Sequence, residues 1–169
     1  MAEPEGTAAA EELGALARDA GLQVAVAESL TSGAVASLLG RAPAASEWFA
    51  GGVVAYSTRV KVEVLGTTGG PVVNRSTAEQ MARGAAGLTG ADLAVATTGV
   101  GGPGSEEGEP AGTVWLGVWS ARGARAERHR FDGDPAAVVA ASAAAAVRLA
   151  LAEARALAGL APPAPGRVS

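Results

Sequence analysis

Apolar positions along the chain alternate between helical and extended spacing. Residues 7–20 place Leu13 and Leu16 on one helical face and stop at Gly21, which predicts a first helix. Short, mostly apolar runs predict buried strands, and helical spacing predicts helices between them. The predicted strands cover 22–27, 51–57 and 93–98; the predicted helices cover 34–39, 58–65 and 76–88, the last opened by a capping box of Ser76 and Glu79.

The C-terminal third of the chain has a different pattern. Residues 113–120 and 125–131 predict a hairpin with a turn at 121–124, and Asp134 followed by Pro135 predicts the start of a helix that runs to about Leu157. Alternating elements closed by a hairpin favour an α/β fold with three α/β/α layers and a mixed, mainly parallel five-stranded sheet. We expect one domain over 1–160 and a disordered Pro-rich tail over 161–169.

Composition narrows the chemistry. The 169 residues include no cysteine and one histidine, His129, so we expect no disulfide, no thiol nucleophile, no metal and no cofactor. The net charge is -4 and no basic face is visible, so nucleic acid is a poor partner. We interpret the basic run 122–130 as a solvated strand edge. No uninterrupted apolar run reaches about 18 residues, so we expect no membrane partner and a cytoplasmic location.

Three polar loops follow the three predicted parallel strands, where sites gather in such sheets. They cover 28–33, 56–61 and 97–104. In the second loop, Lys61 is the only lysine beside 12 arginines, and Tyr56 is the only tyrosine. An arginine cannot act as a base, so a lysine in this chain indicates a titrating amine. The alternative is a lysine on a solvated helix face.

Ser29 follows the first strand at a predicted helix N-terminus, where backbone N–H groups can bind an oxyanion. With Lys61 as base it could be a nucleophile, and the alternative is that it caps the helix. The glycines of 99–112 allow the backbone to approach a ligand, and the alternative is a flexible crossover. This loop is no phosphate-binding Walker motif, because no Gly-Lys-Ser/Thr follows.

Five stretches in order resemble the CinA C-terminal domain family of nicotinamide-nucleotide amidases. That family reads Glu-Ser-Cys-Thr-Gly-Gly, a serine-containing turn with Phe, Gly-Gly-x-Val-x-Tyr-Ser-Asn-x-x-Lys, Ser-Gly-x-x-Gly-Pro and Pro-x-Gly-Thr-Val. The corresponding stretches here are 28–33, 44–49, 51–61, 98–103 and 110–114. No single motif is decisive, but the order and spacing of all five are specific, and they cover roughly residues 10–158.

The resemblance implies hydrolysis of the amide of nicotinamide mononucleotide, without cofactor, by a serine nucleophile and a lysine base. It implies Lys61 as the base, Tyr56 as an orienting or relaying group, and Ser29 as the nucleophile, with Ser46 as the rival. Ser46 precedes the second strand, so it reaches Lys61 only by a folded-back loop or from a neighbouring subunit; we expect a homo-oligomer. The implied substrate-binding residues are Glu28, Thr31, Ser32, Gly33, Thr98, Gly99, Gly101 and Gly102.

The chain departs from the family pattern in several places. Leu30 and Ser32 replace the family's Cys and first Gly, and Thr58 replaces its Asn. The family's last helix opens Gly-Asp-Arg with a second Arg four residues on, and here these positions are Pro135 and Val139. If those arginines bind the substrate phosphate, a bidentate clamp is missing. A second interpretation is therefore a non-catalytic protein that binds a nucleotide or a partner through the same pocket.

Overall fold

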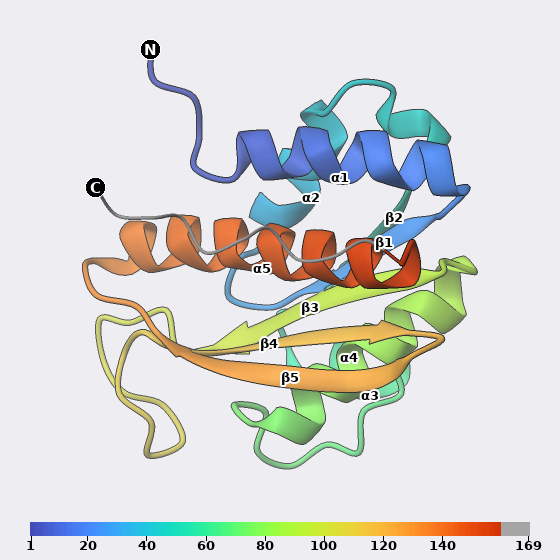
Figure 1. The fold of residues 1–169 in the computed structure, drawn as a ribbon. Helices are drawn as coiled ribbons and strands as arrows, with labels where there is room; N and C mark the ends of the chain where they lie inside the picture. Colours follow the sequence, from blue (N-terminus) through green and yellow to red (C-terminus); the bar gives the residue numbers. More distant parts are fainter. Residues whose placement is uncertain (160–169) are drawn as a thin grey trace.

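A single five-stranded sheet organises the computed structural model, which describes residues 1–159 (Figure 1). The strand order is β2-β1-β3-β4-β5. β1 pairs in parallel with both β2 and β3, whereas β4 is antiparallel to β3 and β5. The strands are β1 (Val24–Glu28), β2 (Phe49–Val54), β3 (Leu93–Gly99), β4 (Thr113–Ser120) and β5 (Gly123–Arg130).

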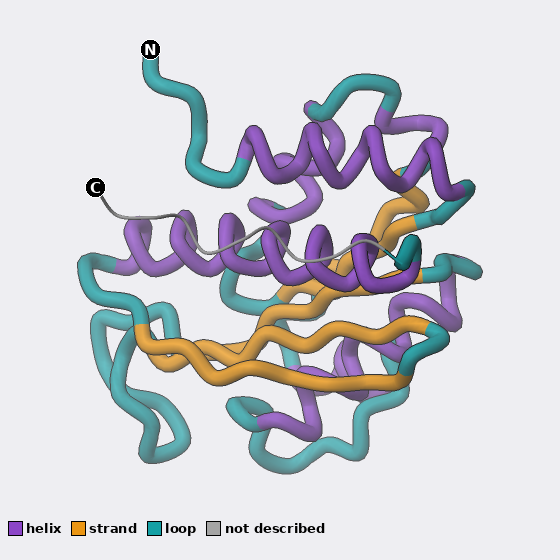
Figure 2. The backbone as a smooth tube through the Cα atoms, viewed as in Figure 1, coloured by secondary structure: helices purple, strands orange, loops and turns teal. Residues whose placement is uncertain are grey.

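Helices cover both faces of this sheet (Figures 1 and 2). The predicted three-layer α/β/α fold is therefore confirmed. The hairpin contributes two of the four strand pairings, so the sheet is mixed rather than mainly parallel. One face carries α1 (Thr7–Ala20), α2 (Ala34–Arg41) and α5 (Pro135–Leu157), and the other carries α3 (Thr58–Glu63) and α4 (Arg75–Thr89).

The two faces of the sheet differ in the size of their side chains. Along β1, Val24 and Val26 belong to the core under α1, α2 and α5, whereas Ala25 and Ala27 belong to the core under α4. β3 repeats the pattern, with Ala94 and Ala96 facing α4. Alanine side chains leave the backbone of α4 close to the sheet. At Gly117 of β4, any added Cβ would overlap the carbonyl oxygen of Ala78 on α4.

Helix α5 is the most apolar helix in the described part of the chain. By length and hydropathy alone its 23 residues could cross a membrane, but half of its most apolar window is buried inside the domain. Asp134 caps it as predicted, because its Oδ1 accepts a hydrogen bond of 2.8 Å from the N–H of Ala137. The helix packs against α1, α2 and the sheet, as expected of a core helix.

Several element boundaries differ from the prediction for local reasons. Helix α4 is capped by Asn74, whose Oδ1 accepts from the N–H of Thr77 at 2.8 Å, so the predicted capping box at Ser76 is wrong. β2 ends at Val54 because Ser57 leaves the sheet and caps α3. The hairpin turn is two residues, 121–122, rather than four. The predicted tail at 161–169 lies outside the described residues.

Strand β5 is the edge strand that the basic run 122–130 predicted. Arg122 and Arg125 do more than face solvent, because both reach the carboxylate of Glu153 on α5, at 3.3 and 3.0 Å. Glu153 is buried, and the hydroxyl of Ser120 also donates to it. The two guanidinium groups therefore compensate a buried charge and tie the hairpin to α5.

We predict opposite effects from two alanine substitutions in α4. Gly84 lies against the backbone of Leu65, and an added Cβ would overlap its carbonyl oxygen. Gly84→Ala should therefore lower the free energy of unfolding by about 1–3 kcal/mol through overpacking. Gly87 faces open space on the same helix. Gly87→Ala should raise the free energy of unfolding by about 0.5–1 kcal/mol, since alanine is the better helix former.

Urea denaturation of both variants measures the difference directly. Equal stabilities for the two variants would contradict the close packing of α4 against the backbone of Leu65.

Candidate active site

A cavity of about 310 Å³ opens where the parallel strands end. Carboxyl ends of parallel strands meet at one edge of a sheet, so the loops after β1, β2 and β3 converge there. The first turns of α5 form the opposite wall. The predicted residues that line the cavity are Ser29, Tyr56, Lys61, Thr98, Gly99, Gly101 and Gly102.

Ser29 occupies the first position after β1. Its backbone N–H donates to the carbonyl oxygen of Thr97 at 3.0 Å, which continues the pairing of β1 with β3. The residue is 8% exposed and lines the cavity. Helix α2 begins beyond it, with Gly33 as its N-cap and no side-chain cap from that residue. Ser29 is therefore not the helix cap that the alternative interpretation proposed.

Glu28 satisfies the N-terminus of α2 instead. Its Oε1 accepts from the N–H of Val35 at 2.9 Å, and its Oε2 accepts from the N–H of Ala36 at 3.0 Å. The side chain is buried and is not among the groups that line the cavity. A carboxylate at this position is stabilised by the positive end of the helix. The structure thus places Glu28, predicted to bind substrate, in a position where it supports the turn that carries Ser29.

The rest of the first loop also lies behind the cavity wall. Thr31 is buried, and its Oγ1 is 2.7 Å from the Oγ1 of Thr97. Ser32 and Gly33 have φ angles of 42° and 107°, so they form the left-handed turn that reverses the chain into α2. None of the three lines the cavity. Their positions suit a rigid support for Ser29.

Ser46 lies at the opposite edge of the sheet. It belongs to a short 3-10 helix, η1 (Ala45–Glu47), immediately before β2 begins at Phe49. A six-residue strand separates it from the loop that carries Lys61, which corresponds to roughly 20 Å. Within one chain the structure does not bring Ser46 and Lys61 together.

Lys61 is the one basic residue among the described residues that line the cavity. The residue is 1% exposed, and its Nζ donates to the carbonyl oxygen of Tyr56 at 3.1 Å. Burial lowers the pKa of Lys61, while the negative charges of Glu107 and Glu106 oppose that change. The sequence suggested Glu28 as the opposing carboxylate, but the two glutamates belong to the loop before β4. The balance of these effects favours a neutral amine at lower pH than an ordinary lysine allows.

Tyr56 contributes its backbone rather than its phenol to this contact. The side chain is 71% exposed at the mouth of the cavity, and the carbonyl oxygen accepts the Lys61 hydrogen bond. In this structure the contact between Tyr56 and Lys61 is made by the main chain, and the orienting or relaying role of the phenol stays a prediction.

Two long loops are fastened to each other over the cavity. The Glu107 carboxylate accepts from the N–H of Val72 at 2.8 Å and from that of Val73 at 2.8 Å. The hydroxyl of Thr98 donates to the carbonyl oxygen of Val72 at 2.8 Å. The loop residues 72–73 and 99–106 are therefore placed by specific contacts, which argues against the flexible crossover considered above.

Half of the lining residues were not predicted to bind anything. Leu30 and Thr58, together with Pro135 and Val139, drew attention only because they differ from the family pattern. Val72 and Val73 lie in a segment without any motif, and nothing in the sequence distinguished Glu106 from other loop carboxylates. These lining residues are Leu30, Thr58, Val72, Val73, Glu106, Pro135 and Val139.

The fold and the cavity define a three-layer α/β domain with a serine and a buried lysine at the carboxyl edge of its parallel strands. A sequence profile of the CinA C-terminal domain matches residues 6–154. The chain belongs to this family, as its five motifs suggested.

Individual relatives agree with this assignment. The nicotinamide-nucleotide amidohydrolase PncC of Pseudomonas putida is 41% identical over 138 residues, which cover 78% of this chain and 86% of that protein. A CinA-like protein of Synechocystis is 43% identical over 115 residues, 64% of this chain but only 28% of the relative. The segment shared with this chain is only 28%, 31% and 35% of the length of three such relatives, so the chain spans about a third of these longer proteins.

Solved structures show the same fold. The crystal structure of a CinA superfamily protein from Klebsiella pneumoniae superimposes with a TM-score of 0.85 at 29% sequence identity, covering 89% of this chain and 98% of that one. Together with the PncC relative, the comparisons support an amidase-like function for the domain.

We predict that the buried amine makes stability depend on pH in a specific way. Because the pKa of Lys61 is lowered in the folded chain, the unfolded chain binds more protons between that value and the ordinary lysine pKa of about 10.4. The free energy of unfolding should therefore rise with pH across this window, relative to Lys61→Met, which has no titrating group. Parallel stability curves from urea denaturation between neutral pH and pH ~10 would contradict the lowered pKa.

Proposed function

We propose that this chain hydrolyses a carboxamide to a carboxylate and ammonia, with Ser29 as nucleophile and Lys61 as general base. The observation that carries the proposal is the buried Lys61 amine in the same cavity as Ser29, with a pKa lowered by burial. A neutral amine can accept a proton from a serine hydroxyl, and an arginine or an ordinary solvated lysine at neutral pH cannot. The domain offers no cysteine as an alternative nucleophile.

The proposed reaction has two halves. In the first, Ser29 Oγ attacks the amide carbon while Lys61 Nζ takes the hydroxyl proton, and the same proton then passes to the leaving nitrogen as ammonia departs. In the second, Lys61 takes a proton from water, which attacks the acyl ester on Ser29. The ester bond breaks, the serine recovers its proton, and the carboxylate leaves. The glycines at 99, 101 and 102 allow the backbone to approach the acyl group.

Nicotinamide mononucleotide is the reference substrate for this proposal. The sequence motifs resemble those of nicotinamide-nucleotide amidases, and the Pseudomonas putida relative is named a nicotinamide-nucleotide amidohydrolase. The alternative is a non-catalytic chain that binds a small nucleotide in the same cavity. The observation that favours the alternative is the absence of arginine at positions 135 and 139.

We predict that Lys61→Arg and Lys61→Met both abolish turnover. The first keeps the charge without a usable base, and the second keeps the volume without an amine. Loss of a general base should lower kcat by about 10²–10⁴-fold, measured as ammonia release, while the chain stays folded by circular dichroism. Near-normal turnover by Lys61→Arg would show that Lys61 contributes only its positive charge and is not the base.

Two serine variants separate the candidate nucleophiles. Ser29→Ala should lower kcat at least as strongly as the lysine variants, whereas Ser46→Ala should retain it, because Ser46 lies at the other edge of the sheet. The reverse result would assign the reaction to Ser46 and require a neighbouring subunit.

We predict a pH profile set by Lys61. The neutral amine is the active form, so kcat/KM should rise with pH through the lowered pKa of the free enzyme. The Glu106 carboxylate raises that pKa, so Glu106→Gln should move the midpoint to lower pH. Glu109 pairs with Arg128 at 3.0 Å and does not line the cavity, so Glu109→Gln is the matched control and should not move the midpoint. A midpoint unchanged in both variants would exclude Lys61 as the titrating base.

A further inference from the structure

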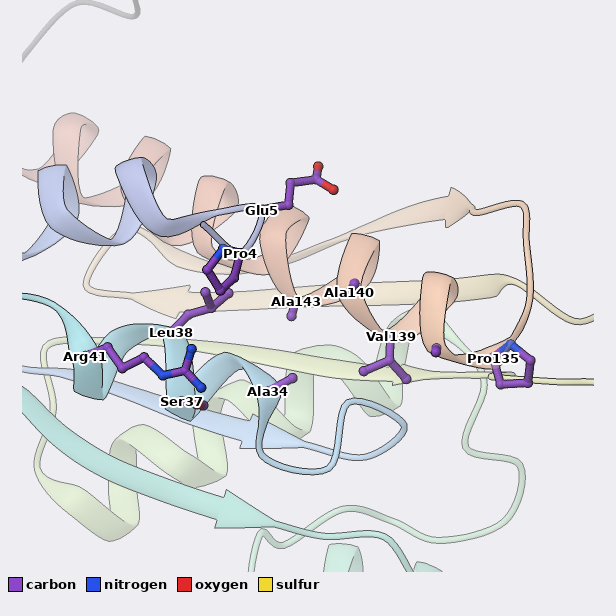
Figure 3. A pocket seen from close by; sticks show the side chains of 11 residues that line it. Pro4, Glu5, Ala34, Ser37, Leu38, Arg41, Pro135, Val139, Ala140 and Ala143 are labelled. Carbon is purple, nitrogen blue, oxygen red and sulfur yellow. The ribbon is translucent and has the colours of Figure 1, made fainter. Parts of the chain in front are cut away.

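A second, larger hollow adjoins the candidate active site. It measures about 600 Å³ and lies between α2, the first half of α5 and the segment before α1. Figure 3 shows Val139, Ala140 and Ala143 of α5 facing Ala34 and Ser37 of α2 across it, with Arg41 near one end and Pro135 at the other. We call this hollow the α2–α5 groove.

The groove adjoins the catalytic cavity. Pro135 and Val139 line both hollows, so these two side chains stand at their common boundary. A substrate whose amide group lies beside Ser29 and Lys61 would enter the groove by passing these two side chains. The groove's volume is also of the size that small-molecule sites have, about 300–1,000 Å³.

The lining of the groove is poor in charge. Among the residues that line it, only Glu5 and Arg41 are charged, and Glu5 forms an ion pair with Arg148 at 3.4 Å. The adjoining cavity has one cation, the buried Lys61 amine, opposed by Glu106. A phosphate dianion needs several charge-assisted donors, ideally a bidentate guanidinium. At the junction of the two hollows, where such donors would be useful, the chain has Pro135 and Val139.

We propose that the α2–α5 groove binds the part of the substrate that lies beyond the amide, and that this part is an apolar alkyl or aryl group rather than a sugar phosphate. The inference rests on the amidase activity proposed above and names the substrate class of that site. An apolar group that enters the groove leaves the water and comes into contact with Val139, Ala140 and Leu38, which favours binding. A phosphate in the same place would lose hydration and would meet a single guanidinium, that of Arg41, at the end of the groove far from Pro135.

A matched series of substrates tests this directly. 1-Methyl-, 1-butyl- and 1-hexylnicotinamide share the ring and the amide of nicotinamide mononucleotide and differ only in what extends from the ring nitrogen. We expect kcat/KM for ammonia release to increase along the series by about two- to fourfold per added methylene until the groove is filled. Nicotinamide mononucleotide should be no better than its dephosphorylated riboside.

The outcomes separate the two proposals. If the protein releases ammonia from none of these amides, the proposed function fails. If it hydrolyses them but prefers the mononucleotide to the riboside by tenfold or more, or shows no dependence on alkyl length, the amidase stands and the apolar groove is overturned.

Variants on α5 provide the structural control. Ala140 lies in the groove and Ala152 is exposed elsewhere on the same helix. Ala140→Glu should reduce the ratio of hexyl to methyl kcat/KM about tenfold or more, whereas Ala152→Glu should leave both rates unchanged. The double variant Pro135→Arg/Val139→Arg should shift preference toward the mononucleotide. An unchanged ratio in Ala140→Glu would overturn the proposal.

A second copy of the chain is the competing occupant of the groove. Sedimentation of the wild type, Ala140→Glu and Ala152→Glu distinguishes it. If Ala140→Glu dissociates an oligomer and leaves the hexyl-to-methyl ratio intact, the groove is an interface between copies and not a substrate site.

Discussion

The parallel register of β1 with both of its neighbours is the constraint on which the candidate site depends. Glu28 aligns with Val54 of β2 and with Thr97 of β3, so β1 and β2 end together and β3 runs two residues further, to Gly99. The serine, the lysine and the glycine loop are far apart in sequence, and this alignment brings them to one edge of the sheet. A shift of one residue in either pairing would also turn the apolar side chains of that strand to the wrong face, so the core and the site specify the same register.

The fold acts on the pKa of Lys61 in two opposite ways. Burial of the side chain removes the amine from water, which disfavours its charge. The loop before β4 supplies the opposing carboxylates, and one of them, Glu107, also fastens that loop to residues 72–73. The Glu107 carboxylate thus both holds the two loops together and opposes the lowering of the Lys61 pKa. A substitution at Glu107 would change both properties at once.

Features that depend on neighbouring residues could be predicted from the sequence, whereas contacts between residues far apart in the chain could not. Helix α1, the Asp134 cap and the end of α5 were predictable, because each depends on neighbours within a few residues. The cavity residues after β1, β2 and β3 could be inferred from the rule for parallel strands and from the family motifs. The capping role of Glu28 could not be predicted, since its partners are N–H groups in the first turn of α2, seven and eight residues further along the chain. Nor could Glu107, whose partners lie 34 and 35 residues away.

The alanine face under α4 has a consequence for how the domain can vary. Ala25, Ala27, Ala94 and Ala96 have no side-chain volume to give up short of glycine. Substitution there can act almost only by adding atoms, and added atoms must push a helix away from a sheet. On the valine and leucine face, change can run in both directions, through cavities as well as through crowding. Sequence change is therefore less free at the alanine positions of the sheet under α4, where only added volume is available, than at the valine and leucine positions of the other face.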